Sequence, residues 1–209
     1  MHLSQHELDL ISWCALSEPG DALTNLIWNA FGPEALESIK KQDFETWRNF
    51  ISESFPEYLS ELRSMEERVC LRLPRANAYQ LVERGIRWNA RPVAVASLPS
   101  VEGRLSDLGV HAPLLIWVAG DRVALEQDFA GIVGTRKPSV KGASNARGLV
   151  ASLRMPIVSG GAVGIDRAAH EAALEFGLPT VAIMAGGLDK AYPMENWEMF
   201  HQIVRSGGV

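Results

Sequence analysis

Short apolar runs alternate with stretches of helical length from residue 114 to the end of the chain. The runs lie at residues 114–118, 129–133, 157–158 and 180–184. Between and after them, residues 140–153, 162–176 and 194–204 have the spacing of amphipathic helices. Short buried strands separated by helices are typical of βαβ units, in which the strands form a parallel sheet. Residues 114–209 are therefore predicted to form an α/β domain.

The first 70 residues show a different pattern, in which apolar side chains recur at helical spacing between tight turns. Pro19-Gly20 and Gly32-Pro33 end the first two expected helices, and Asp21 is placed to cap the second. We expect a small all-helical domain at residues 1–70 and a connecting segment at residues 71–113. In that segment, helices are predicted at 78–84 and 98–109 and a strand at 86–88.

Composition narrows the class of protein. The chain has 209 residues, of which 47% are hydrophobic, so it can bury a core of ordinary size. No apolar run approaches 18 residues, and the N-terminus lacks a basic region followed by an apolar stretch, so neither a membrane span nor a secretory signal is predicted. Cys14 and Cys70 are too few for a disulfide framework or a cysteine-built metal site. A reducing cytoplasm is the expected compartment, with no metal and no cofactor.

The charge is unevenly distributed along the chain. The formal net charge is −5, but residues 1–70 carry −8 and residues 71–209 carry +3. No acidic residue occurs between Asp128 and Asp166, a stretch that holds five cations: Arg136, Lys137, Lys141, Arg147 and Arg154. Local charge decides whether a site attracts a polyanion, so this stretch is the candidate for contact with phosphates. The acidic first domain is not expected to bind them.

Three loops at the predicted strand ends are rich in glycine: residues 131–139, 159–166 and 185–189. Ligands of open parallel sheets bind beyond the carboxyl ends of the strands. In the second loop, glycines allow close backbone approach and a helix begins with unpaired N–H groups, a geometry that binds anions. We therefore predict a phosphate or DNA site formed by residues of all three loops: Gly134, Thr135, Arg136, Lys137, Ser159, Gly160, Gly161, Gly164, Asp166, Gly186 and Gly187.

The motifs leave the type of phosphate ligand open. A dinucleotide fingerprint requires a first glycine where Ser159 stands, and no P-loop occurs, so NAD and ATP fit poorly. Asp166 and His170 are four residues apart on one helix, a spacing that suits an acid/base pair, half of a metal site, or simple bracing of the loop. We favour bracing. Asp189 is expected to fix a turn, and no Ser-His-Asp arrangement is visible, so no catalytic residue is predicted.

The segments GIVGTRKPS, SGGAVGID with AAH, and GGLDKAYP resemble, in order and spacing, the DprA family of DNA-processing proteins, also called Smf. The resemblance implies an α/β fold in which a SAM-like helical domain precedes a Rossmann-like parallel sheet. It also implies a non-catalytic protein that binds single-stranded DNA and loads the RecA recombinase during natural transformation. Arg136 and Lys137 would contact the DNA backbone, and Ser159, Gly160, Gly161 and Gly164 would form the phosphate pocket. A homodimer is a further expectation.

One departure from the family and two alternative functions accompany this resemblance. The family continues past the position of Val209 with a basic motif, further strands and a winged-helix-like domain, so we expect a fragment or a shortened protein with an incomplete sheet. One alternative is a nucleotide phosphoribohydrolase of the lysine-decarboxylase-like family. The Gly186-Gly187 loop, however, lacks the threonine and catalytic glutamate of that family's signature. The other alternative is a fragment with a purely structural role.

Overall fold

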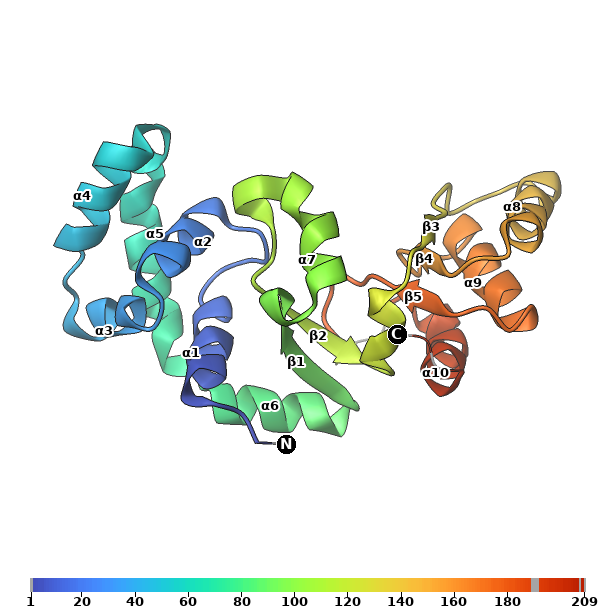
Figure 1. Cartoon of the computed structure of the whole chain (residues 1–209), viewed down its shortest axis with the longest axis horizontal. Helices are drawn as coiled ribbons and strands as arrows, with labels where there is room; N and C mark the ends of the chain where they lie inside the picture. The colour runs from blue at the N-terminus through green and yellow to red at the C-terminus, as the bar shows by residue number, and fades with distance from the viewer. Residues whose placement is uncertain (1, 189–191, 207, 209) are drawn as a thin grey trace. The chain divides into compact units, whose positions relative to one another are not determined.

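The computed structural model describes residues 2–188, 192–206 and 208 (Figure 1). The chain divides into two compact units, which are described separately. The first comprises Met1–Glu83 and Pro92–Ile116, and the second comprises Arg84–Arg91 and Trp117–Val209. Among the described residues, no helix has both the length and the apolar character needed to cross a lipid bilayer.

The first unit is built from helices around one apolar core. Its α-helices are α1 (Gln5–Cys14), α2 (Ala22–Phe31), α3 (Glu34–Lys41), α4 (Glu45–Ser54), α5 (Leu59–Arg72), the first part of α6 (Ala78–Arg87) and α7 (Pro99–Leu105). Short 3-10 turns lie at Pro56–Tyr58, Leu73–Arg75, Val95–Ser97 and Ser106–His111. Trp13, Trp47 and Ile51 are fully buried at the centre. The two tryptophan rings meet edge to face with centroids 5.9 Å apart.

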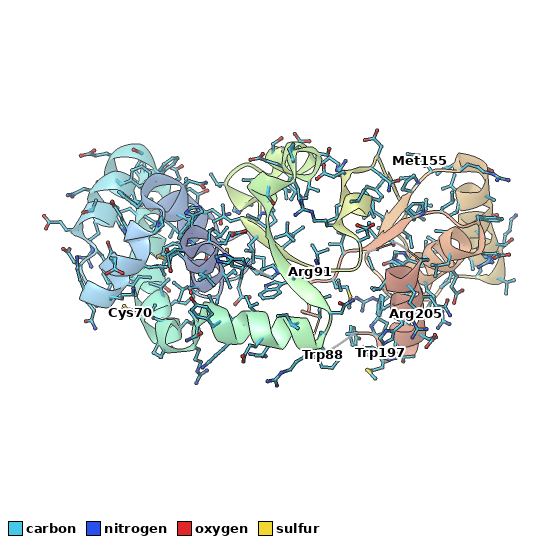
Figure 2. All side chains as sticks on the ribbon, turned by 60° about the horizontal axis from the view of Figure 1, so that its bottom comes forward. Cys70, Trp88, Arg91, Met155, Trp197 and Arg205 are labelled. Carbon is cyan, nitrogen blue, oxygen red and sulfur yellow. The ribbon has the colours of Figure 1, made fainter. Side chains whose placement is uncertain are left out.

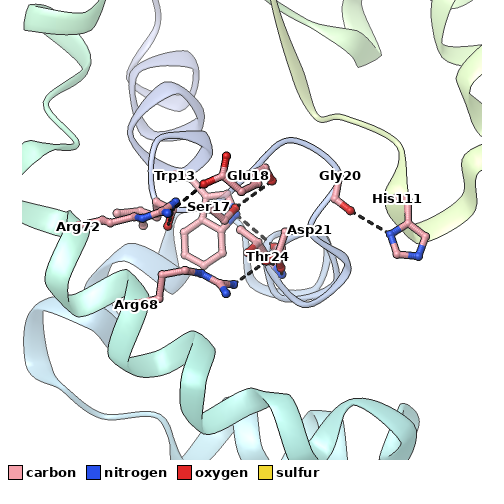
Figure 3. Close-up of polar contacts among 10 residues, drawn as sticks. Trp13, Ser17, Glu18, Gly20, Asp21, Thr24, Arg68, Arg72 and His111 are labelled. Atoms are coloured by element: carbon pink, nitrogen blue, oxygen red, sulfur yellow. Dashed lines mark hydrogen bonds and ion pairs between the residues drawn. The ribbon is translucent and has the colours of Figure 1, made fainter. Parts of the chain in front are cut away.

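Asp21 links the start of α2 to α5, as Figure 3 shows. Its Oδ1 accepts hydrogen bonds from the Thr24 backbone N–H (2.9 Å) and hydroxyl (2.8 Å). Its Oδ2 pairs with the Arg68 guanidinium. The predicted cap is therefore confirmed, and the same carboxylate also neutralises a partly buried arginine. A second ion pair, between Glu18 and Arg72, joins the turn before α2 to α5 at the surface.

Replacing Asp21 with alanine should lower the free energy of unfolding by about 2 kcal/mol, because the α2 cap is lost and Arg68 is left without its partner. Glu18→Ala removes the matched but exposed pair and should cost ~0.5 kcal/mol or less. Urea denaturation of both variants measures the difference. Equal losses would show that the cap contributes nothing beyond a surface ion pair.

The predicted connecting segment packs onto the helical core. Ala94, Val110 and Leu114 lie against the buried cluster of the first unit. The Asn25 side chain donates to the carbonyl oxygens of Val110 and Ala112, both at 2.8 Å. Residues 92–116 therefore belong to the same compact unit as the helices before them.

The second unit contains the parallel sheet. Its strands are β3 (Ala130–Gly131), β4 (Ile157–Ser159) and β5 (Thr180–Ala182), which pair in the order β3-β4-β5 with every pairing parallel. Helices α8 (Val140–Leu153) and α9 (Ile165–Glu175) pack together and enclose a core with the sheet (Figure 1). The remaining elements are 3-10 turns at Arg122–Glu126 and Met194–Asn196, and α10 (Trp197–Arg205). The α/β class with a parallel sheet after helices is as predicted.

Two strand predictions were wrong in detail. Residues 86–87 belong to α6, and the strand begins later, as β1 (Ala90–Ala94). At Gly85, inside this helix, a Cβ would collide with the Trp117 ring, so glycine permits the close packing of the helix on that ring. The apolar run at 114–118 does form a strand, β2 (Leu115–Ala119), but it pairs with β1 and, within the described residues, not with β3–β5. The boundary between the two units crosses both β1 and β2.

Candidate phosphate site

The three glycine-rich loops meet at one edge of the parallel sheet. Ile157 lies opposite Ala130 on one side and Thr180 on the other, so β3, β4 and β5 end together. The carboxyl ends of parallel strands share an edge, and residues 132–139, 160–164 and 183–188 therefore leave the sheet side by side.

The first and second loops interlock through glycine. The Thr135 carbonyl oxygen accepts a hydrogen bond from the Ile165 backbone N–H (3.1 Å) at the start of α9. Gly164 has φ +95°, and a Cβ there would lie 2.8 Å from the Arg136 Cα. A Cβ on Gly134 would lie 2.7 Å from the Ile165 side chain. Both glycines are thus needed for close contact between the loops.

Two buried side chains form hydrogen bonds with the backbone of the second loop. Asp166 Oδ2 accepts from the Ala162 backbone N–H at 3.3 Å, the bracing role favoured above. The Asn196 amide nitrogen donates to the Gly161 carbonyl oxygen at 2.8 Å. Within the described part of the chain, the N–H groups of Val163 and Gly164 donate to no protein acceptor. Unpaired N–H groups at the start of a helix favour an anion.

A cavity of about 250 Å³ opens where these loops meet. Arg136 from the first loop, Gly160 and Val163 from the second, and Gly186 from the third contribute to its wall. Tyr192 completes one side. No carboxylate or imidazole occurs among the described residues that line it. The cavity therefore combines backbone donors, one guanidinium and apolar side chains.

The predicted site residues fall into two groups. Those that line the cavity are Arg136, Gly160 and Gly186. Those that build the loops around it, or lie next to them, are Gly134, Thr135, Lys137, Ser159, Gly161, Gly164, Asp166 and Gly187. Asp189, the predicted turn residue, lies outside the described residues.

Ser159 differs from the expectation. Its side chain is 3% exposed, and its hydroxyl donates to the Ile132 carbonyl oxygen at 2.6 Å. The hydroxyl of Ser159, a residue expected in the phosphate pocket, is therefore used inside the protein to join the ends of β3 and β4. A short hydroxyl beside a strand end suits either role, so the sequence could not distinguish them.

Charge at the site comes from the first loop. Arg136 and Lys137 are exposed, and no acidic side chain in the described ranges pairs with either. Arg147, in contrast, forms ion pairs with Glu175 and Glu171. The cations of the acid-free stretch are thus not equivalent: Arg147 is paired, whereas Arg136 and Lys137 are available to an anion in the loop that borders the cavity.

His170, on α9, is a buried structural residue that does not line the cavity. It is fully buried, and its Nδ1 lies 2.7 Å from the Thr180 hydroxyl oxygen. That hydroxyl donates to the Ile157 carbonyl oxygen (3.1 Å), so Nδ1–H is the donor to Thr180. Burial lowers the pKa of His170 to about 4, and the nearby Asp166 carboxylate opposes this only in part. The imidazole is therefore neutral at pH 7 and ties α9 to β5.

This depressed pKa predicts acid sensitivity. In the unfolded chain His170 takes up a proton near pH 6.5, whereas in the folded chain it does so only near pH 4. The contribution of neutral His170 to the free energy of unfolding is therefore complete above pH 6.5 and is lost as the pH falls from 6.5 to 4. By pH 5, His170 should account for about 2 kcal/mol of lost unfolding free energy. Urea denaturation at pH 7 and pH 5 measures it, with His170→Gln as the reference. An equally large loss in that variant would assign the effect to other groups.

A second cavity of the same unit, about 370 Å³, lies beside α10 and has a different character. Its wall is mainly apolar and includes Trp88, Trp117, Trp197 and Phe200. The rings of Trp88 and Trp197 meet edge to face with centroids 6.3 Å apart, and Figure 2 shows the two residues next to each other. Because its wall is mainly apolar, it is the weaker candidate for a phosphate.

Two residues of the site were missed by sequence reasoning. Asn196 lies inside a stretch that was predicted simply as helix, and only the structure shows its side chain turned to the Gly161 carbonyl. Tyr192 was noted only as part of the third motif, yet it lines the cavity. An aromatic residue next to a glycine-rich loop was the available signal in the sequence.

Comparison with known proteins agrees with this architecture. The model of the family described as DNA recombination-mediator protein A matches residues 98–209. A relative from Mycobacterium tuberculosis is 39% identical over 122 residues, which cover 55% of this chain and 31% of that protein. The DNA processing protein DprA of Streptococcus pneumoniae is 40% identical over 87 residues, or 41% of this chain and 31% of that protein.

A solved structure has a similar fold. The X-ray structure of DNA processing protein A from Streptococcus pneumoniae superimposes with a TM-score of 0.62 at 23% identity. It covers 97% of this chain and 65% of that one. The matches to the curated relatives above span about a third of those proteins' length. Since the family model matches more than half of the residues, this chain belongs to the DNA recombination-mediator protein A family.

Proposed function

We propose that this chain binds single-stranded DNA through its phosphate backbone, at the cavity formed by the three glycine-rich loops. One phosphate would accept hydrogen bonds from the N–H groups of Val163 and Gly164, with Arg136 and Lys137 supplying positive charge. The protein would act by binding alone, without breaking a bond in its ligand.

The observation that carries this proposal is that unused backbone N–H donors and cations without an acidic partner occur at the same site. Arg136 and Val163, whose N–H group has no acceptor among the described residues, line one cavity, and Gly164 with its own unused N–H follows Val163 directly. Such a site favours an anion that is held by its oxygens rather than by base edges. The lack of a carboxylate in the described lining supports binding over hydrolysis of a nucleotide, because a phosphoribohydrolase of the type considered above uses a glutamate.

We further infer a role in DNA processing during natural transformation, in which the bound strand is passed to a RecA-type recombinase. Support comes from membership of a family described as recombination mediators and from relatives named DNA processing protein DprA. Pairing of two copies of the chain belongs to the same proposal, and sedimentation of the purified chain tests it.

The test is fluorescence anisotropy with a labelled oligo-dT of about 20–35 nucleotides at two salt concentrations. We expect saturable binding that weakens as salt rises, since phosphate contacts release counterions. An unlabelled duplex should compete poorly, and AMP should remain unchanged when its products are followed by chromatography. Salt-independent binding, or release of a base from AMP, would contradict the proposal.

A further inference from the structure

Tyr192 exposes a large aromatic side chain at the wall of the phosphate cavity. It is 71% exposed, yet it lines the same cavity as Arg136 and Gly160. Ile183, at the end of β5, lines this cavity too and is 63% exposed. Inorganic phosphate makes no use of such side chains, whereas the face of a nucleobase does. The wall thus has one region suited to an anion and another suited to a flat apolar group.

The segment that carries Tyr192 is fixed to the loop that offers the backbone donors. Asn196 donates to the Gly161 carbonyl oxygen at 2.8 Å. From α9, the Arg167 Nη1 donates to the Glu195 carbonyl oxygen at 3.2 Å. These two contacts hold residues 195–196, shortly after Tyr192, against the loop, and Tyr192 and the loop line the same cavity, so a ligand there would meet both.

We propose that Tyr192, with Ile183 beside it, forms a platform on which an unpaired nucleobase of the bound strand stacks. The inference rests on the proposed function, in which the phosphate next to that base is held by Val163, Gly164 and Arg136. Stacking needs the face of the base to be free, and a duplex covers that face with its neighbours. The platform therefore selects single strands, while every type of base can occupy it.

Anisotropy titrations with Tyr192→Ala and Tyr192→Phe test the platform, with oligo-dT and an abasic oligonucleotide of equal length as ligands. Tyr192→Ala should weaken oligo-dT binding about fivefold or more, the lower range of base stacking on an aromatic ring. Tyr192→Phe should bind like the unaltered protein. Tyr79→Ala removes a tyrosine of matched exposure (68%) from α6 and should leave binding unchanged.

The abasic ligand completes the test, because it keeps the phosphates and lacks the bases. The unaltered protein should bind it about as weakly as Tyr192→Ala binds oligo-dT, and Tyr192→Ala should lose nothing further on it. If the unaltered protein binds both ligands equally and Tyr192→Ala matches it, the platform is refuted while the phosphate site stands. If the unaltered protein binds neither ligand, the proposed function fails, and the platform fails with it.

Discussion

Replacing Arg136 with alanine is expected to weaken binding of oligo-dT about 10- to 100-fold at low salt. Arg136 lines the cavity, has no acidic partner in the described ranges, and would form a charge-assisted hydrogen bond with a phosphate. The loss of one phosphate contact should also reduce the slope of log binding constant against log salt concentration by about 0.7, the value for a single strand. Titrations at several salt concentrations measure both effects.

Arg154→Ala is the matched control for this result. Arg154 belongs to the same acid-free stretch and is exposed, but it follows the far end of α8, away from the loops. Its removal should change affinity by about twofold or less, as expected for a distant surface charge. Equal losses in the two variants would mean that DNA is attracted by diffuse surface charge, and the cavity would then have no special role.

The second large effect is expected for Gly164→Ala. A Cβ at this position would overlap the Thr135 carbonyl oxygen and approach the Arg136 backbone at 2.8 Å, and φ +95° strains any residue with a side chain. We expect a loss of about 3 kcal/mol or more in unfolding free energy. Oligo-dT binding should also fall, since relief of the overlap separates the loop that carries Arg136 from the start of α9.

Gly148→Ala serves as the control for Gly164→Ala. Gly148 lies within α8, where an added Cβ would meet nothing within 4 Å. Alanine is the better helix former, so this change should raise stability by roughly 0.5–1 kcal/mol and leave DNA binding unaltered. Thermal or urea unfolding of the two variants measures the change in the free energy of unfolding for each. Unchanged stability in Gly164→Ala would contradict the interlocked loops.

Helices with clear end signals were predictable from the sequence. Residues 140–153 were expected as a helix, and α8 has these bounds, because Ser139 caps its first turn and apolar residues recur at helical spacing. The strands were predictable in place but not in length. The run at 129–133 yields only Ala130–Gly131 as β3, because the chain turns into the first loop directly after it.

The sequence could predict that the three loops meet at one site, but not which hydrogen bonds their side chains form there. Parallel strands must end together, so glycine-rich segments after three of them had to meet. Which polar group faces outward is decided by tertiary contacts. Ser159 bonds to Ile132, and His170 bonds to Thr180 rather than to the loop. Asn196 reaches Gly161 across 35 residues of sequence, a contact that no local pattern encodes.

The most direct test of the phosphate site is an NMR titration of the ¹⁵N-labelled chain with unlabelled oligo-dT. We expect the largest amide shifts at Val163 and Gly164, followed by residues around Arg136 and Gly186. A titration with inorganic phosphate should move the Val163 and Gly164 signals in the same direction, at higher ligand concentration. Shifts that spread over the outer surface of α8, or that leave Val163 and Gly164 unmoved, would contradict this expectation.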